Sequence, residues 1–418
     1  MEGIYSLIIG ILNLSIRTAS FFNEKARLWV NGRKNWEQQL RKKFELNTSP
    51  VIWFHCASLG EFEQGKPVME KMIELFPHHK LLVTFYSPSG YEIRKNYEKA
   101  FHTMYLPIDT KDNARKLISI TRPSVVLFVK YEFWHFYIKE ANQNNIPCIC
   151  FSAAFRRDQL FFKPYGKFYL NILKMFHKIY VQNFSSVELL KHHGIKDAEF
   201  AGDTRFDRVK ETAANQKEFP LIKEFCQSKP VFIAGSVWPE DMEVIISYIN
   251  NYGKHFKFII APHEIKQKEI DEYIARINTT CTKYSIGKIS SEDVLFIDNI
   301  GILSHIYRFG RFSFIGGAFK QGLHNILEAA TFGLPVFFGP EYKKFPEAGD
   351  LISLNAAFSV NNAEEMNSII YKINTPERLT EIRKVCKKYI DENAGATEKI
   401  IQYCNEILSQ KSGEKWKD

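Results

Sequence analysis

The sequence predicts an α/β protein with two doubly wound parallel sheets. From residue 51 onward, short apolar runs rich in β-branched and aromatic residues alternate with longer segments of helical periodicity, which is typical of βαβ units. A polar stretch at residues 209–230 interrupts this rhythm, which then restarts. Two similar halves predict two domains with a cleft between them. Ligands of such sheets bind outside the carboxyl ends of the strands, so the chemistry is expected in the loops that follow the strands.

The elements can be assigned in chain order. The first half contains expected strands at residues 51–57, 81–85, 125–129, 148–152 and 179–182. The second half contains expected strands at 231–234, 256–261, 294–297, 312–315 and 336–338, followed by a helical stretch at 363–408. The expected divisions are an N-terminal helix and basic flank (1–43), a first domain (44–208), a linker (209–230), a second domain (231–390) and a C-terminal helix and tail (391–418).

The N-terminal segment is typical of a membrane anchor. Residues 4–16 carry no charge, and the first 43 residues hold eight lysines and arginines against three acidic residues, out of a net charge of +9 for the chain. Either a tilted span or an in-plane amphipathic helix fits this pattern. The basic flank predicts that the rest of the chain is cytoplasmic. A secretory signal is disfavoured because Glu2 stands where a positive charge is expected. Nucleic-acid binding is disfavoured because the basic residues flank an apolar run.

Several sequence motifs that mark common binding and catalytic sites are missing. The seven cysteines are odd in number and scattered, which favours a reducing compartment over a disulfide framework. No Asp-x-Asp motif and no Walker loop occur, and no G-x-G-x-x-G follows the first strand of either half. These absences disfavour a metal-dependent sugar transferase and a dinucleotide-dependent dehydrogenase. We therefore predict a nucleotide-sugar donor, with no metal ligands and no cofactor.

A turn with a candidate catalytic carboxylate follows the first expected strand. The segment 55–61 reads His-Cys-Ala-Ser-Leu-Gly-Glu, which places Glu61 at the start of the next helix. A carboxylate there can accept a proton from a sugar hydroxyl within hydrogen-bond reach. Alternatively, Glu61 merely favours the helix N-terminus, an effect of about 0.3 to 1 kcal/mol. The residues alone do not decide between these readings.

The second half contains a glycine-rich block at residues 314–340. A strand enters the turn Gly316-Gly317, a helix is expected to begin near His324, and a further strand leads to Gly339-Pro340. Glycines let the backbone approach a phosphate, and a helix N-terminus offers unpaired amides to bind it. Glu328 is expected four residues into that helix, in reach of ribose hydroxyls. Tight strand-helix packing is the alternative reading.

Three smaller motifs complete the candidate site. Ser236 and His263 each follow a strand of the second half, on the same expected edge as the glycine block. The motif at 202–207 reads Gly-Asp-Thr-Arg-Phe-Asp and lies just before the domain boundary. Its Arg205 can contact an anionic donor, although solvent exposure is the commoner fate of such an arginine.

Together these residues resemble the 3-deoxy-D-manno-octulosonic acid (Kdo) transferases that act on the lipid A precursor. The resemblance covers nearly the whole chain. Besides the motifs above, it includes residues 32–34, 84–90, 105–109 and 132–134. The chain departs from the family pattern at His135, where a proline is expected, and at Pro262, where an arginine is usual.

The resemblance implies two facing Rossmann-like domains of the GT-B type and inverting, metal-independent transfer of Kdo from CMP-Kdo to the lipid A precursor (lipid IVA). It implies that Glu61 is the general base, that Glu132 shapes the catalytic cleft, and that Ser58 and Gly60 lie on the acceptor side. It implies a donor pocket lined by Arg205, Ser236, His263, Gly317, Gly322, Asn325 and Glu328. CMP would leave against the helix terminus at residues 322–325. The expected location is the cytoplasmic face of the inner membrane.

Two rival readings remain. One is a membrane-associated GT-B transferase that uses a UDP-sugar, which competition between CMP and UDP distinguishes. The other is a nucleotide-binding membrane protein that has kept the fold without catalysis, which the presence of Glu61 disfavours.

Overall fold

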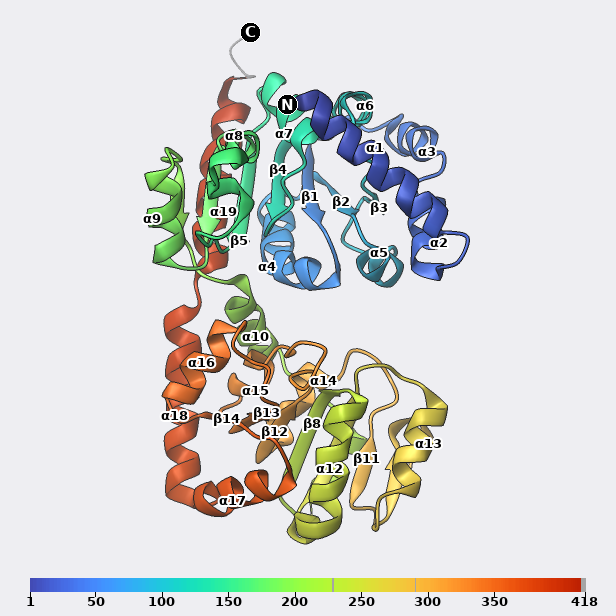
Figure 1. Ribbon diagram of the computed structural model, residues 1–418, viewed down its shortest axis with the longest axis vertical. Coiled ribbons are helices and arrows are strands. Elements are labelled where there is room, and N and C mark those ends of the chain that lie inside the picture. Colours follow the sequence, from blue (N-terminus) through green and yellow to red (C-terminus); the bar gives the residue numbers. More distant parts are fainter. Residues whose placement is uncertain (228, 290, 415–418) are drawn as a thin grey trace. The chain divides into compact units, whose positions relative to one another are not determined.

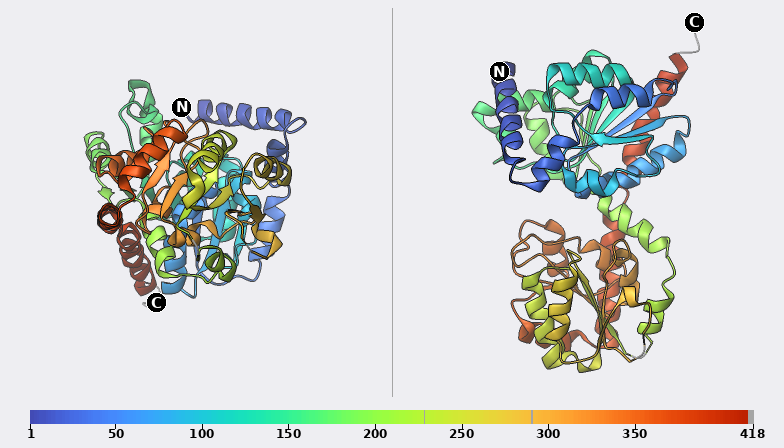
Figure 2. Two further views of the ribbon diagram at one scale, coloured as in Figure 1. Left: turned by 90° about the horizontal axis from the view of Figure 1, so that it is seen from below. Right: turned by 90° about the vertical axis from the view of Figure 1, so that its right-hand side faces the viewer.

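The computed structural model describes residues 1–227, 229–289 and 291–414. They form two compact units, each an α/β layer structure (Figures 1 and 2). The first unit comprises Met1–Arg208 and the C-terminal segment from Ala394 onward, and the second comprises Val209–Asn393. The chain therefore enters the second unit once and returns to the first.

The first unit is built on a seven-stranded parallel sheet with the strand order β3-β2-β1-β4-β5-β6-β7. The central strands are buried along nearly their whole length, which explains why they read as continuous apolar runs. The strands are β1 (Val51–Cys56), β2 (Lys80–Phe85), β3 (His102–Tyr105), β4 (Pro123–Val129), β5 (Cys148–Ala153), β6 (Lys178–Val181) and β7 (Ala198–Phe200).

The second unit repeats this plan with the order β10-β11-β9-β8-β12-β13-β14, again all parallel. Its strands are β8 (Val231–Val237), β9 (Lys257–Pro262), β10 (Cys281–Lys283), β11 (Val294–Phe296), β12 (Phe312–Ile315), β13 (Val336–Phe338) and β14 (Ala357–Ser359). The two parallel sheets confirm the predicted α/β class. All ten expected strands exist, and the four that the sequence did not indicate (β3, β7, β10 and β14) are the edge strands of the two sheets.

Helices cover both faces of the first sheet (Figure 1). Along β1, Val51 and Trp53 belong to one apolar core, and Ile52 and Phe54 belong to the other. The first core is covered by α1 (Glu2–Ala19), α3 (Trp36–Phe44), α6 (Lys111–Thr121), α7 (His135–Gln143), α8 (Lys167–Leu173) and α9 (Phe184–His192). The second is covered by α4 (Leu59–Leu75), α5 (Pro88–Arg94) and α19 (Ala396–Glu414), while α2 (Glu24–Asn31) follows α1.

The remaining helices accompany the second sheet. They are α11 (Pro220–Phe225), α12 (Pro239–Tyr252), α13 (Gln267–Ala275), α14 (Leu303–Ile306), α15 (Leu327–Ala330), α16 (Pro346–Ser353), α17 (Ala363–Ile373) and α18 (Pro376–Asn393), and α10 (Thr204–Ala214) carries the chain across the boundary. Residues 209–230, expected to be a linker, contain the end of α10 and all of α11. Ile222 and Phe225 of α11 are fully buried, so this segment is part of the packed second unit.

One face of α1 is attached to the first unit by a buried carboxylate. Tyr5 donates its hydroxyl hydrogen to Asp109 at 2.5 Å, and the same carboxylate accepts the backbone N–H groups of Phe136 and Tyr137 at the start of α7. Burial raises the pKa of Asp109 to about 6. Glu2 adds an ion pair to Lys139 of α7 at 2.5 Å. None of the described helices is both long and apolar enough to cross a membrane.

Arg33 fastens the segment after α2 to the sheet. Its guanidinium donates to the carbonyl oxygens of Trp29, Tyr86 and Leu106 at 3.0, 2.8 and 2.8 Å. It also lies over the Trp29 ring, 3.8 Å from the centroid. A Cβ on the preceding Gly32 would stand 2.2 Å from the Tyr105 ring, so only glycine allows this approach. The Gly32-Arg33 motif is thus explained by packing.

We predict that Tyr5→Phe loosens α1 while the sheet keeps its stability. The substitution removes a hydrogen bond to a buried carboxylate, a contribution of about 1.5 to 3 kcal/mol. Hydrogen exchange should show faster exchange of the α1 amides, by about ten- to a hundredfold, with β1 and β4 unchanged. Tyr165→Phe is the matched control, because Tyr165 is 72% exposed in the same unit. Equal exchange in α1 of both variants would show that the Asp109 contact does not hold the helix.

Candidate active site

Glu61 lies where β1 passes into α4, at the carboxyl edge of the first sheet. Ser58 is the N-cap residue of α4, and Glu61 is the third helical residue, which is the spacing of a capping box. The Ser58 side chain does not cap a backbone amide, however; its hydroxyl donates to the Glu61 carboxylate instead. Glu61 is half-buried, so its carboxylate is oriented by Ser58 and still reachable from solvent.

The turn that carries Glu61 is held by its neighbours. A Cβ on Gly90 of α5 would stand 2.3 Å from the Phe85 ring and 2.9 Å from the Ser58 carbonyl carbon, so the Gly90 backbone packs against the turn. Gly60 is exposed, and a Cβ there would meet only the Ser58 hydroxyl oxygen at 3.7 Å. Gly90 is therefore required by packing, whereas Gly60 leaves the surface beside Glu61 open.

Glu132 follows β4, the strand next to β1, at the same edge of the sheet. Its Oε2 lies 3.1 Å from His55 Nε2 and accepts the Trp134 indole N–H at 2.8 Å. The Glu132 side chain is only 15% exposed and His55 is fully buried. The carboxylate is thus fixed by two nitrogen groups from β1 and from the loop that carries it.

A hydrogen-bond chain beneath Glu132 defines its surroundings. The Thr84 hydroxyl accepts the Trp53 indole N–H at 2.8 Å and lies 2.8 Å from His55 Nδ1. The Trp134 indole nitrogen also lies 3.0 Å from His55 Nε2, and the Thr84 hydroxyl lies 3.3 Å from the Phe54 carbonyl oxygen. This network is fully buried up to the carboxylate, so it orients Glu132 rigidly. The sequence analysis did not single out His55 or Trp134 as functional residues, although His55 begins the motif at 55–61 and Trp134 ends the motif at 132–134.

The motif at 202–207 acts within the first unit. The Arg205 guanidinium donates to the buried Asp203 carboxylate at 2.8 Å, and Gln64 donates to the same carboxylate at 3.1 Å. Burial opposes ionisation, but Arg205 holds the pKa of Asp203 below its usual value. Asp207 accepts the backbone N–H groups of Gly395 and Thr397 at 2.5 and 2.7 Å, which caps α19. Arg205, expected on the donor side, is thus occupied by a structural carboxylate.

The glycine block forms a closed loop at the carboxyl edge of the second sheet. A Cβ on Gly316 would stand 2.3 Å from the Ser236 carbonyl oxygen, and one on Gly317 would stand 2.2 Å from the Gly322 carbonyl oxygen. Gly317 and Gly322 have φ angles of 97° and 102°, which disfavour any other residue. Ser236 itself has a φ of 53° at the end of β8. These contacts bring Ser236, Gly317 and Gly322 together.

Asp241, which the sequence analysis missed, supports this loop from below. It is fully buried, and its carboxylate accepts the N–H groups of Trp238 and Gly317, each at 2.8 Å. Burial raises the pKa of Asp241 to about 6. The signal in the sequence is an acidic residue in the first turn of a helix after Trp238-Pro239, which is the pattern of an N-terminal cap.

The predicted helix start near His324 is wrong, because the described helix begins later. The described helix α15 covers only Leu327–Ala330, and Gly322, His324 and Asn325 lie in an irregular segment before it. Glu328 is the second helical residue rather than the fourth. The physical reason is that His324 donates its backbone N–H to the Gly316 carbonyl oxygen, which closes the loop instead of opening a helix. Asn325 donates to Glu328 at 3.4 Å, so these two predicted residues do meet.

His263 is part of an aromatic stack beside the loop. Its ring stacks on Trp238 and on His324, with centroid distances of 4.3 and 4.4 Å. The Trp238 indole donates to His324 Nε2 at 3.0 Å. Burial and the neighbouring His263 lower the pKa of His324 to about 4, and burial also lowers the pKa of His263. Both imidazoles are therefore neutral at pH 7 and offer flat faces next to the glycine loop.

The predicted residues thus fall into two groups. Ser58, Glu61 and Glu132 lie at the carboxyl edge of the first sheet, while Ser236, His263, Gly317, Gly322, Asn325 and Glu328 lie around the corresponding edge of the second. Within the described residues, no three His, Cys, Asp or Glu side chains form a group that could hold a metal ion.

Comparisons with known proteins agree with this arrangement. A family model for 3-deoxy-D-manno-octulosonic-acid transferase (Kdo transferase) matches residues 34–208. The chain is 29% identical over 415 residues to the 3-deoxy-D-manno-octulosonic acid transferase of Rickettsia typhi, covering 95% of this chain and 89% of the relative. It is 28% identical over 327 residues to that of Aquifex aeolicus, covering 77% and 85%.

A solved glycosyltransferase from Rickettsia africae has a similar fold. Its TM-score is 0.56 at 13% identity, and the match covers 87% of this chain and 99% of the other. At that identity the likeness shows the fold alone, which is the two-domain GT-B arrangement of parallel sheets. The family model spans the unit with Glu61 and Glu132, and the relatives extend over most of both units. These matches support a Kdo transferase, and the chain is a glycosyltransferase.

Proposed function

We propose that this enzyme transfers Kdo from CMP-Kdo to a lipid A precursor, with inversion and with Glu61 as the general base. The observation that carries the proposal is the position of Glu61 at the carboxyl edge of the first sheet, half-buried and oriented by Ser58. The family supports Kdo as the sugar. The preorganised turn supports a catalytic role over a capping role, because Ser58 leaves the helix amides uncapped and binds the carboxylate instead.

The proposed reaction is a single displacement. Glu61 accepts the proton of an acceptor hydroxyl as that oxygen forms a bond to the anomeric carbon of Kdo. The bond from this carbon to the phosphate oxygen breaks at the same time, and CMP leaves with the bonding electrons. Attack opposite to the leaving group inverts the anomeric carbon. Glu132, fixed by His55 and Trp134, supplies a second oriented acceptor group for sugar hydroxyls on the same edge.

In the second unit, the loop around Gly317 and Gly322 is proposed to bind the phosphate of CMP. A Cβ on Gly322 would meet only the Phe345 ring, at 3.7 Å, so the surface beside this glycine is open to an incoming phosphate. The stacked imidazoles of His263 and His324 provide a flat face beside it, and Glu328 is the proposed acceptor of ribose hydroxyl hydrogens. Backbone amides would stabilise the departing phosphate electrostatically. We expect transfer to be independent of metal, as the family resemblance implies.

The location proposed is the cytoplasmic face of the inner membrane, with α1 lying on the bilayer. Six apolar side chains of α1 are 41% to 66% exposed, namely Ile4, Leu7, Ile8, Ile11, Leu12 and Leu14. Phe21 and Phe22, in the turn that follows, are 77% and 90% exposed. The opposite face is fixed to the unit by Tyr5 and Ile9, so α1 can lie in the interface with its exposed side in the lipid. The basic residues of α3 favour anionic lipids.

We predict that Glu61→Gln lowers the rate of transfer by about a hundred- to ten-thousandfold, the usual contribution of a general base. A transfer assay with CMP-Kdo and a tetra-acylated lipid A precursor measures it. Binding of CMP, followed by calorimetry, should be unchanged. Glu74→Gln is the control, since Glu74 lies on the same helix and is 68% exposed. Full activity of Glu61→Gln would remove the base assignment.

A donor competition test separates the proposal from a UDP-sugar transferase. CMP should inhibit transfer, UDP should not, and EDTA should leave the rate unchanged. The assay uses radiolabelled Kdo, with CMP-Kdo generated in place. Inhibition by UDP at the same concentration as CMP would favour the rival donor, and loss of product in EDTA that Mg²⁺ restores would contradict metal independence.

The membrane proposal predicts that Leu7→Ser with Ile11→Ser weakens binding to phosphatidylglycerol vesicles. Burying one Leu or Ile side chain contributes about 1.5 to 3 kcal/mol, so a ten- to hundredfold lower partition coefficient is expected for these partly exposed residues. Co-sedimentation with vesicles measures it. A control variant with Ile286→Ser and Ile300→Ser changes two exposed residues of the second unit, 59% and 85% exposed, and should bind normally. Equal binding of both variants would refute docking through α1.

A further inference from the structure

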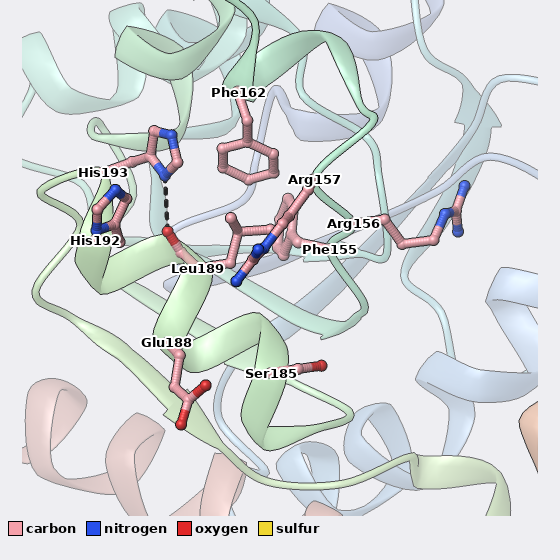
Figure 3. A pocket seen from close by; sticks show the side chains of 9 residues that line it. All are labelled: Phe155, Arg156, Arg157, Phe162, Ser185, Glu188, Leu189, His192 and His193. Atoms are coloured by element: carbon pink, nitrogen blue, oxygen red, sulfur yellow. Dashed lines mark hydrogen bonds between the residues drawn. The ribbon is translucent and has the colours of Figure 1, made fainter.

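A cationic pocket lies in the first unit, away from Glu61 but at the same edge of the sheet. It has a volume of about 760 Å³ and is formed by the loop after β5 together with α9, which follows β6 (Figure 3). The strand order is β1-β4-β5-β6, so β5 and β6 stand two and three positions from the strand that carries Glu61. At about 4.8 Å per strand, the lateral separation is roughly 10 to 15 Å.

The charge of the pocket comes mainly from Arg157. Within the described chain, no hydrogen bond or ion pair engages its guanidinium. In Figure 3, Arg157 extends among the aromatic rings toward α9, whereas Arg156 points away from them. Arg156 also has a partner, Asp158, at 3.6 Å. Glu188 is the only acidic residue of the lining, and Figure 3 shows its carboxylate turned away from Arg157.

The floor of the pocket is apolar. Phe155 is 3% exposed, and its ring lies 6.0 Å from that of Phe162, which in turn packs 4.8 Å from the His193 ring. Leu189 contributes from α9, and its carbonyl oxygen accepts the His193 Nδ1 hydrogen at 2.9 Å. His193 is therefore held in place, with its other ring nitrogen available. An unpaired guanidinium above apolar side chains suits a ligand in which an anionic group adjoins hydrocarbon.

We propose that this pocket binds a phosphate group of the glycolipid acceptor, with Arg157 as its principal contact. This phosphate-binding proposal rests on the proposed function, and it adds a subsite that recognises the acceptor. A lipid A precursor is a phosphorylated, acylated disaccharide, so it offers a phosphate at sugar-sized distances from the reacting hydroxyl and hydrocarbon next to it. Guanidinium groups bind phosphate with two parallel hydrogen bonds, which gives orientation as well as affinity. Phe155, Phe162 and Leu189 would contact the adjacent hydrocarbon.

The test compares KM values of the full-length enzyme for two acceptors, the phosphorylated precursor and the same lipid treated with phosphatase. Arg157→Gln should raise the KM for the phosphorylated acceptor about tenfold, the loss expected for one charge-assisted hydrogen-bonded pair. The KM for CMP-Kdo and kcat should stay unchanged. With the dephosphorylated acceptor, Arg157→Gln should have no further effect. Glu188→Gln should lower the KM for the phosphorylated acceptor, because it removes a nearby negative charge.

Arg115→Gln is the matched control, because Arg115 of α6 is 68% exposed and its loss changes the net charge equally. An unchanged KM in Arg157→Gln, or the same increase with both acceptors, would overturn the phosphate subsite. If Arg157→Gln weakened sedimentation with phosphatidylglycerol vesicles and left the acceptor KM intact, the pocket would bind bilayer headgroups and the proposal would be wrong. A wild-type enzyme without Kdo transfer would instead refute the proposed function.

Discussion

Burial of both faces of each parallel sheet is the constraint on which the rest of this structure depends. Alternate residues of β1 enter two different apolar cores, so no polar side chain from the middle of that strand can reach solvent. Reactive groups are therefore confined to the edge where parallel strands end. Glu61, Glu132 and the glycine loop all occupy such an edge. The hydrophobic effect therefore determines the position of the candidate site, independently of what catalysis requires.

Side chains at a buried edge need partners, and the partners make the site rigid. Glu132 is fixed by His55 and Trp134, and His55 is fixed by Thr84. Asp241 has the same role in the second unit, where it binds the Gly317 amide. An unpaired buried polar group is costly, so these hydrogen bonds offset most of the cost of burial, although Asp241 Oδ1 has no partner among the described residues. The same hydrogen bonds that offset desolvation fix the orientation of the Glu132 carboxylate and of the Gly317 amide.

The sequence predicted the central strands and the glycine block because both have strong local signals. It missed the edge strands β3, β7, β10 and β14, which are three or four residues long and border the sheet on one side only. Such strands need fewer apolar residues, so their periodicity is weak. The helix after Gly322 was placed too early because glycines and amides suggested a terminus, whereas a nonlocal bond from His324 to Gly316 closes the loop. The ion pair between Arg205 and the buried Asp203 depends on tertiary contacts that the local sequence does not show, and the donor-side role of Arg205 stays a prediction.

The carboxylate that fastens α1 also fixes the active-site edge. Asp109 accepts hydrogen bonds from Tyr5 of α1 and from the first amides of α7. The N-cap residue of α7 is Trp134, whose indole donates to Glu132. One buried group therefore joins the helix proposed to lie on lipid to the helix terminus beside a site carboxylate. Packed helices move as rigid elements. The proposed orientation of α1 on a membrane would therefore set how this edge faces the lipid surface, where the proposed acylated acceptor would reside.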